Sequence, residues 1–330
     1  MSRFRCSLMA TALAFALFAP QVAMIAFGES LAPVAKIDIP GVGFTVGARG
    51  PSGSDIITYD PGTKMIYLAN GRNNAVDVFD PATNKMVYRI PLLGDPHQVY
   101  VDNDKGLLYA ALGTMKVAIV RLGNGGVQYI DVGGTSIADL IGYDPDDSLL
   151  VVGSKGEAFL SFISISPDGV GSLASQLPLP GDSPEEPKYD PVQHRFLLTL
   201  RNTIAVIDPI SMSITDTWDL AGCGPHEWAF GPNREAMIGC SRGEQIINLD
   251  TGAIVASIPN SVVGDTDQPT YDPKTNRYYA PGHVARDGAN VAVLAVVDAA
   301  TREVINVFDI DPGSYIQGAV DPTSGNVYIA

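Results

Sequence analysis

The sequence predicts an all-β protein, a single seven-bladed β-propeller of four-stranded antiparallel blades. Short runs of alternating apolar and polar residues are separated by turns rich in Gly, Pro, Asn and Asp, which is typical of β-strands. A Tyr-Asp-Pro landmark, or a close variant, also recurs roughly every 40 to 50 residues, which is the period of a propeller blade. The seven landmark positions are Asp60, Asp102, Asp144, Asp190, Gly231, Asp272 and Asp321.

One whole repeat can be read from residues 56–94. Its four predicted strands are residues 56–59, 65–69, 75–79 and 86–90, and Asp-Pro or Asn-Gly turns separate them. A lone four-stranded unit cannot bury both of its faces, so it needs neighbours of the same kind. The later repeats supply those neighbours.

These repeats also resemble a known family. Residues 57–87 (ITYDPGTKMIYLANGRNNAVDVFDPATNKMV), 272–279 (DPKTNRYY), 297–301 (VDAAT) and 321–328 (DPTSGNVY) resemble the repeat of the YVTN family of bacterial β-propellers. The resemblance extends from about residue 35 to the end and implies a propeller fold. It implies little about activity, because the family includes many members with no assigned one.

The two ends of the chain are expected to share the last blade. Residues 34–39 read as an outermost strand, and residues 313–330 supply only the first two strands of the seventh repeat. Propeller rings commonly close by combining both termini in one blade, so this blade is predicted to be incomplete. Because the sequence stops inside a repeat, a C-terminally truncated fragment is the favoured interpretation.

Residues 1–28 have the pattern of a secretory signal peptide, which leaves residues 29–330 as one propeller domain. Arg3 and Arg5 precede a short apolar run, and small residues lie near a plausible cleavage site before Glu29. The alternative is an uncleaved anchor, but Pro20 and Gln21 interrupt the run before it reaches the length of a membrane span. We therefore predict a periplasmic or extracellular protein with no membrane span in the mature chain.

The chain is acidic, with 36 Asp and Glu against 21 Lys and Arg. Removal of residues 1–28 takes away two arginines and no acid, so no basic stripe remains. This argues against nucleic acid and anionic membrane surfaces as partners. We expect a monomer that binds a small molecule or a protein at the propeller rim.

Two cysteines remain once Cys6 is removed with the signal peptide. Cys223 precedes the first strand of the fifth repeat and Cys240 ends its second strand, so a hairpin brings them together. Two cysteines in an exported chain, placed at the ends of one hairpin, indicate a disulfide. Some YVTN-type proteins carry a similar Gly-Cys pair, which agrees with a structural disulfide.

Candidate functional residues lie where the innermost strand of each blade begins. Such positions form a ring at one mouth of the central channel, and six of the seven are ionisable. The ring positions, five residues before each landmark, are Asp55, His97, Asp139, Glu185, His226, Asp267 and Ile316. The alternative is a hydrated channel entrance at which these side chains are only solvated.

The functional interpretation is a site of histidines and carboxylates at this rim. Three or four members could hold a divalent ion such as Ca, Mg, Mn or Zn. The candidate metal ligands are His97, Asp139, Glu185, His226 and Asp267. His97 or His226 is the candidate general base in an enzyme. Asp55 is a candidate ligand-binding residue, and so are His283 and Arg286, which lie in a predicted long loop over the same rim (residues 281–290).

Three functions remain open at this point. The first is a binding protein whose rim recognises a small ligand, a metal ion or a partner protein. The second is a metal-dependent lyase or lactonase that uses the same rim. The third is a subunit that supports a redox partner, as some related propellers do. No nucleophile motif, phosphate loop, zinc-protease motif or haem-attachment motif is present in the sequence.

Overall fold

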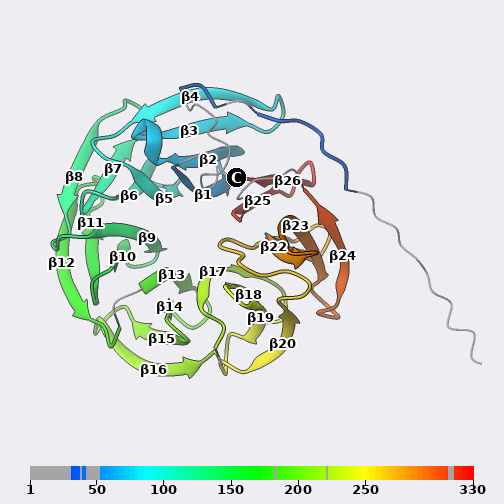
Figure 1. The fold of residues 1–330 in the computed structure, drawn as a ribbon. Coiled ribbons are helices and arrows are strands. Elements are labelled where there is room, and N and C mark those ends of the chain that lie inside the picture. The colour runs from blue at the N-terminus through cyan, green and yellow to red at the C-terminus, as the bar shows by residue number, and fades with distance from the viewer. Residues whose placement is uncertain (1–30, 38, 42–52, 182–183, 221, 311–315) are drawn as a thin grey trace, which may run out of the picture. The chain divides into compact units, whose positions relative to one another are not determined.

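A computed structural model describes residues 31–37, 39–41, 53–181, 184–220, 222–310 and 316–330. The predicted signal peptide lies outside the described residues. From Ala35 onward the chain forms one compact unit, in which small antiparallel sheets are arranged around a central axis (Figure 1). The β-propeller predicted from the repeats is confirmed.

The first blade has the four strands that the sequence predicts. Neighbouring strands pair antiparallel in the order β1-β2-β3-β4. Their bounds are β1 Ser54–Asp60, β2 Met65–Asn70, β3 Ala75–Asp80 and β4 Lys85–Pro91. β1 is the innermost strand and β4 the outermost (Figure 1).

Five further blades repeat this order from the channel outwards. The second blade contains β5 Pro96–Asp102, β6 Leu107–Leu112, β7 Lys116–Arg121 and β8 Val127–Asp131. The third contains β9 Ile137–Asp144, β10 Leu149–Lys155, β11 Phe159–Ile165 and β12 Gly171–Pro178. The fourth contains β13 Pro184–Asp190, β14 Arg195–Leu200, β15 Thr203–Asp208 and β16 Ser213–Asp219.

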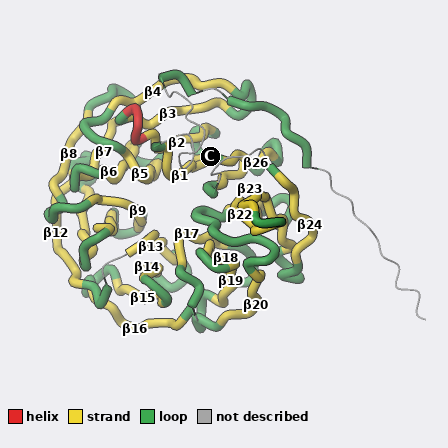
Figure 2. The backbone as a smooth tube through the Cα atoms, in the orientation of Figure 1, coloured by secondary structure: helices red, strands yellow, loops and turns green. Residues whose placement is uncertain are grey.

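The fifth blade contains β17 Pro225–Phe230, β18 Glu235–Cys240, β19 Gly243–Asn248 and β20 Ile254–Pro259. The sixth contains β21 Thr270–Asp272, β22 Arg277–Arg286, β23 Ala289–Asp298 and β24 Val304–Asp309. Figure 2 shows that strands and loops make up nearly all of the described chain, with the short 3₁₀ turn Gly71–Asn73 as the helical exception. None of the helices in the described part of the chain is long and apolar enough to cross a membrane.

The described part of the chain has six full blades and a small seventh sheet, which corrects the count of seven blades and agrees with the prediction that the last one is incomplete. Six sheets have four strands, and the seventh repeat forms a small two-stranded sheet of β25 Gly318–Asp321 and β26 Asn326–Ile329. The predicted strand at residues 34–39 is also wrong for the part that is described, which is irregular backbone. Ile37 and Ile39 nevertheless pack into the hydrophobic cluster that contains Tyr328 and Ala330. The N-terminal segment therefore meets the last sheet by apolar packing and not by strand pairing.

The predicted long loop of the sixth repeat is wrong as well. Residues 281–290 belong to an extended hairpin in which β22 and β23 pair as far as Arg286 and Ala289. Asp287 and Gly288 form the tight turn, and both have positive φ angles. An Asp-Gly pair suits such a turn, because both residues tolerate this conformation, so strand pairing continues where a loop was expected.

The recurring landmark aspartates have a structural role. The carboxylate of Asp60 accepts a hydrogen bond from the backbone N–H of Thr63 at 2.6 Å, and Asp272 accepts one from Lys274 at 2.9 Å. Each of the six landmark aspartates is buried. The repeated motif therefore closes the turn after each innermost strand, which explains its period without any functional requirement.

The predicted disulfide between Cys223 and Cys240 is confirmed, and their Cα atoms are 5.1 Å apart. It joins the start of β17 to the end of β18 across one hairpin. Beside it, the buried Glu244 accepts a hydrogen bond from the backbone N–H of Cys240 at 2.8 Å. Burial, reinforced by Asp265 and opposed by hydrogen bonds from Thr266 and Cys240, raises the pKa of Glu244 to about 8.

This buried acid predicts a pH dependence of stability. An acid with a raised pKa keeps its proton in the folded state after the unfolded chain has lost it, so stability falls as pH rises from about 4.5 to about 8. The substitution Glu244→Gln removes this contribution. We expect the loss of unfolding free energy between pH 5 and pH 8 to shrink by roughly 1–2 kcal/mol, measured by urea unfolding. An unchanged pH slope in the variant would contradict this prediction, and Glu303→Gln on the surface is the control.

Candidate functional site

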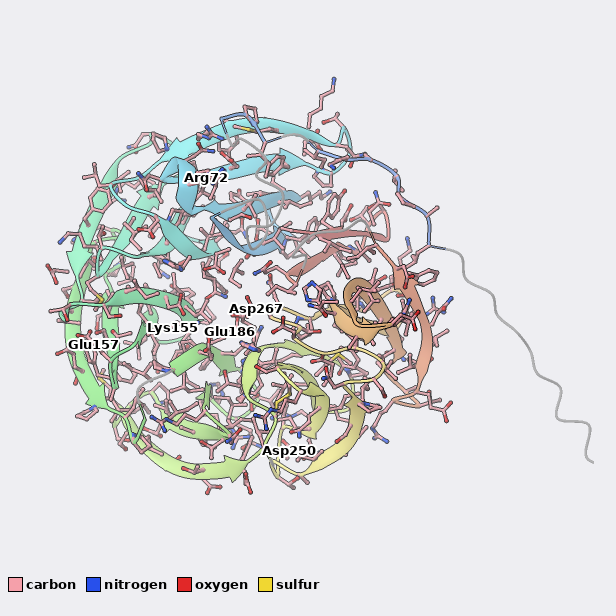
Figure 3. All side chains as sticks on the ribbon, viewed as in Figure 1. Arg72, Lys155, Glu157, Glu186, Asp250 and Asp267 are labelled. Atoms are coloured by element: carbon pink, nitrogen blue, oxygen red, sulfur yellow. A yellow bond between two sulfur atoms is a disulfide. The ribbon has the colours of Figure 1, made fainter. Side chains whose placement is uncertain are left out.

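The predicted ring of charged residues forms a contact network at the channel. Asp55, His97, Asp139, Glu185 and His226 lie near the first residues of the innermost strands of five successive blades. Asp267 lies three residues before the start of β21, the innermost strand of the sixth blade. Figure 3 shows Asp267 and Glu186 near the middle of the ring of blades, whereas Asp250 lies further out.

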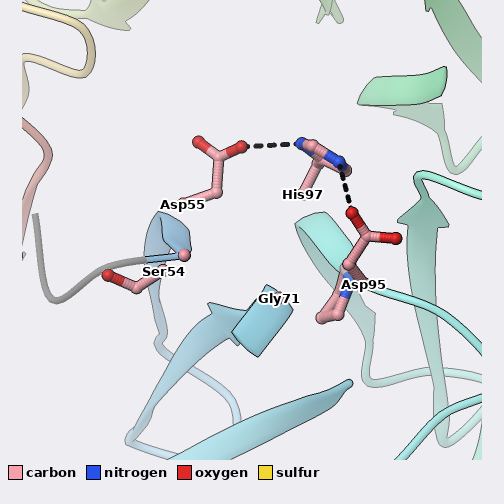
Figure 4. A pocket seen from close by; sticks show the side chains of 7 residues that line it. Ser54, Asp55, Gly71, Asp95 and His97 are labelled. Carbon is pink, nitrogen blue, oxygen red and sulfur yellow. Dashed lines mark hydrogen bonds and ion pairs between the residues drawn. The ribbon is translucent and has the colours of Figure 1, made fainter. Parts of the chain in front are cut away.

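The closest group in this ring is Asp55, His97 and Asp139. His97 Nδ1 lies 2.8 Å from Asp55 Oδ2 and 3.1 Å from Asp139 Oδ1. The other ring nitrogen, Nε2, lies 3.5 Å from Asp95 Oδ2, on the segment just before β5 (Figure 4). One imidazole from the second blade thus joins carboxylates from the first and third blades.

The environment of His97 favours its charged form. Burial alone would lower the pKa of His97, but the hydrogen bonds and negative charges of Asp139 and Asp55 outweigh it and raise the pKa to about 10. An imidazole that is already protonated cannot accept a proton. Without a metal ion, His97 therefore acts as a cation between carboxylates, and the role of general base is better suited to His226.

Sequence reasoning missed Lys155, which lies at the end of β10 in the third blade. Its Nζ is 3.2 Å from Asp139 Oδ2 and 3.1 Å from Glu185 Oε2. Burial opposes the charge of Lys155, but the two carboxylates prevail and raise its pKa. Lys155 comes from a second strand and not from the ring position, so the repeat pattern offered no signal for it.

The other half of the ring is organised by His226 and Asp267. His226 Nδ1 lies 3.3 Å from Asp267 Oδ1, and His226 Nε2 lies 2.9 Å from the hydroxyl of Ser241. Burial and the nearby charge of Lys155 lower the pKa of His226, although Asp265 opposes this. His226 is therefore the neutral histidine of the pair.

Two ring carboxylates hold protons more tightly than ordinary acids. Burial, together with the charge of Asp139, raises the pKa of Glu185 to about 7, although Lys155 pulls it down. Burial and the charge of Asp55 likewise raise the pKa of Asp267 to about 7. Crowded acids of this kind are frequent at functional sites, and structural ion networks also produce them.

His283 and Arg286, which were expected to lie over the rim, are in two different places. Arg286 pairs with Asp309 on the outermost strand of its blade, with 2.6 Å between Nη1 and Oδ1. His283 Nδ1 lies 3.6 Å from Asp265 Oδ2, and its backbone pairs with Gly264. The structure therefore brings His283 towards the half of the rim that contains His226 and directs Arg286 to the outer edge of the blade.

A second polar layer lies one residue further along the innermost strands. Gln98 donates a hydrogen bond to Glu186 at 2.9 Å, which joins the second blade to the fourth. Gln268 exchanges hydrogen bonds with the backbone of Ile57, which joins the sixth blade to the first. Glu227 is buried here, and burial together with Asp267 raises its pKa well above the ordinary value. These bridges tie non-adjacent blades together beneath the rim.

A pocket of about 180 Å³ opens beside His97. The lining residues are Gly53, Ser54, Asp55, Gly71, Asp95, Pro96 and His97 (Figure 4). Gly113 lies beside Asp95, and a Cβ at this position would lie 2.5 Å from both carboxylate oxygens, so the Asp95 side chain would have to shift. The pocket is small and acidic, so it suits water, a cation or a small cationic group.

Comparison with known proteins adds information on the fold alone. No family model matches the chain, and no curated protein matches it. Among solved structures, a chain in the crystal structure of the mitotic checkpoint complex superposes with a TM-score of 0.68 at 13% sequence identity. The match covers 98% of this chain and 96% of that chain. At this identity the likeness shows a shared propeller architecture.

Proposed function

We propose that this chain is a propeller binding protein that holds one divalent transition-metal ion at its channel rim through Asp55, His97 and Asp139. One observation carries the proposal. Among the described residues, these three place one ligand atom each within 4.8 Å of one another. One imidazole nitrogen with two carboxylate oxygens is a donor set that suits Zn, Mn or Fe better than Ca or Mg.

The surroundings of His97 fit a metal on Nδ1. Both carboxylates approach this nitrogen, so an ion there would take the place of its proton. Asp95 faces the opposite nitrogen, Nε2, at 3.5 Å. Histidine ligands commonly donate their second ring N–H to a carboxylate, which orients the ring. The adjoining pocket leaves room for water or a small ligand to complete the coordination.

The proposal keeps His97 and Asp139 from the predicted metal ligands and adds Asp55, which was predicted as a ligand-binding residue. Lys155 engages Asp139 Oδ2 and Glu185, and His226 and Asp267 face each other on the other half of the rim. Glu185, His226 and Asp267 are therefore assigned to the environment of the site. His283 remains a candidate contact for a ligand that extends from the rim towards Asp265.

Isothermal titration with Zn²⁺ and with Mn²⁺ on metal-stripped protein tests the proposal. We expect one ion per chain, and we expect His97→Ala and Asp139→Asn each to weaken binding by 10-fold or more. His194→Ala is the matched control, because His194 lies 3.6 Å from Asp146 on an exposed turn. Absence of binding, or equal loss in the control, would contradict the proposal.

We also propose that the chain is exported and belongs with the YVTN-type propellers. The disulfide supports export, because such bonds persist in oxidising compartments. The repeated Asp-Pro-x-Thr-Asn and Tyr-Val-type strings support the family. Closure of the seventh sheet by the N-terminal segment is supported by the packing of Ile37 and Ile39 beside Tyr328.

A further inference from the structure

We propose that Ser241, His226 and Asp267 form a serine-hydrolase triad on the rim, which cleaves small uncharged or cationic carboxylic esters. This inference goes beyond the metal site and does not rest on it. Its basis is two contacts that link a serine, a histidine and an aspartate, and no sequence motif predicted them. Ser241 Oγ lies 2.9 Å from His226 Nε2, and His226 Nδ1 lies 3.3 Å from Asp267 Oδ1.

The order of atoms is the one that activates a serine. A base on Nε2 removes the hydroxyl proton, while an acid on Nδ1 orients the ring and stabilises the imidazolium that forms. The contact between His226 Nδ1 and Asp267 is an ion-pair contact and not a hydrogen bond. Such contacts are often loose before a substrate binds. Triads arise on unrelated folds, so the geometry is the criterion and not the position in the sequence.

The serine is both held in place and open to solvent. It directly follows Cys240, whose disulfide partner Cys223 directly precedes Gly224. The carbonyl of Gly224 accepts a hydrogen bond from the backbone N–H of Ser241 at 3.0 Å. It also lies 3.3 Å from the hydroxyl oxygen, so it competes with His226 for the single hydroxyl proton. Ser241 is itself exposed. A substrate can therefore reach a hydroxyl whose backbone is anchored by the disulfide.

The histidine has the protonation state that a base needs. Burial and the charge of Lys155 keep its pKa low, so His226 is neutral at pH 7. Its side chain is 24% exposed and that of Asp267 is 21% exposed. The backbone of Asp267 is fixed by its N–H, which donates to the carbonyl of Ile316 at 3.0 Å, and by its carbonyl, which accepts from Glu227 at 3.1 Å.

The reaction has two steps, the acylation of Ser241 and the hydrolysis of the acyl-serine. Ser241 Oγ forms a bond to the ester carbonyl carbon, and its proton passes to His226 Nε2. The bond from that carbon to the alkoxy oxygen breaks, and the leaving oxygen takes the proton from His226. Water then adds to the acyl-serine with His226 as base, which releases the carboxylic acid and restores the hydroxyl. The acidic rim, with Asp265 and Glu185 near His226, disfavours anionic esters.

A fluorophosphonate probe tests the triad through its first step. The serine oxygen forms a bond to phosphorus and fluoride leaves. We expect peptide mapping to place one label per chain on Ser241, with EDTA present or absent. The label should be lost in Ser241→Ala, and its rate should fall by 100-fold or more in His226→Gln. Far-UV circular dichroism checks that both variants fold.

Ser211 is the matched reference, because its exposed hydroxyl donates to Asp208 at 2.8 Å and lies beside the hydroxyl of Ser213 instead of a histidine. We expect Ser211→Ala to label like the unmodified chain. Labelling of Ser241 no faster than of Ser211 would overturn the proposal. So would hydrolysis of p-nitrophenyl acetate that is no faster than in Ser241→Ala.

The role of Asp267 as a positioning residue has a separate readout. The charged and titratable groups that face the pair are Lys155, Asp265, Asp55, Glu185 and Glu227. The neutral amide of Gln317 donates a hydrogen bond to Asp267 at 3.0 Å. Because Asp267 ionises near pH 7, the labelling rate should rise between pH 6 and pH 8. Asp267→Asn should lower the rate and remove this rise, whereas a merely structural role would leave the pH profile unchanged.

Discussion

Replacing Lys155 with methionine is expected to lower the unfolding free energy by about 3 kcal/mol at pH 8. Its ammonium group is the cation that contacts both Asp139 and Glu185, whose side chains are 4% and 10% exposed. Removing one partner of a buried ion pair leaves uncompensated charge, which costs more than the intact pair contributes. Lys155 itself is 43% exposed, so water screens part of this effect and the lower end of the usual range applies.

The pH dependence of this variant checks the cause. Glu185 already has a pKa of about 7 beside Lys155, and loss of the ammonium raises it further. A raised acid pKa means that stability is lost as pH rises, so the variant should lose less stability at pH 5 than at pH 8. Part of the loss remains at pH 5, because Asp139 has a lowered pKa and stays ionised there. Lys116→Met is the control, since Lys116 and Asp131 form an exposed pair, and it should cost under about 1 kcal/mol. Equal destabilisation at pH 5 and pH 8 in urea unfolding would contradict the explanation.

Adding a single methyl group at Gly142 is expected to destabilise the fold by about 3 kcal/mol or more. Gly142 lies in β9, the innermost strand of the third blade. A Cβ there would lie 2.0 Å from the carbonyl oxygen of Pro187, which lies in β13, the innermost strand of the next blade. This oxygen belongs to backbone that is fixed in a sheet, so it cannot move away as the end of a flexible side chain could.

Gly123→Ala is the matched control for Gly142→Ala. A Cβ at Gly123 meets nothing within 4 Å, and its φ angle is an ordinary one. This substitution should leave stability within about 1 kcal/mol of the unmodified chain or increase it slightly. Thermal and urea unfolding of the two variants measure the difference. Similar stabilities would show that the blades can separate locally without cost.

The fold could be predicted from the sequence because its signals are local and repeated. Strand alternation and Asp-Pro turns specify each hairpin, as in residues 56–90, and the recurrence of buried aspartates such as Asp60 and Asp272 specifies the number of repeats. The pairing of Cys223 with Cys240 follows from the same hairpin geometry. Errors arose where local signals end: at the irregular segment near Ile37 and in the hairpin around Asp287.

The candidate site was only partly predictable. Because equivalent positions of a repeat occupy equivalent places around an axis, the period alone identified Asp55, His97 and Asp139 as neighbours on the rim. The period could not show which of the two ring histidines is charged and which is neutral. His97 is drawn into its charged form by two carboxylates, whereas burial and a nearby ammonium keep His226 neutral.

The propeller architecture, the disulfide and the ring of ionisable residues could thus be predicted from the sequence. Contacts within and between the blades fix which ring members meet, and they add Lys155 and Ser241 from positions outside the repeat pattern. The physical reason is that strand and turn preferences act over a few residues. A side-chain contact between blades depends on how two backbones approach each other, and no stretch of sequence encodes that approach alone.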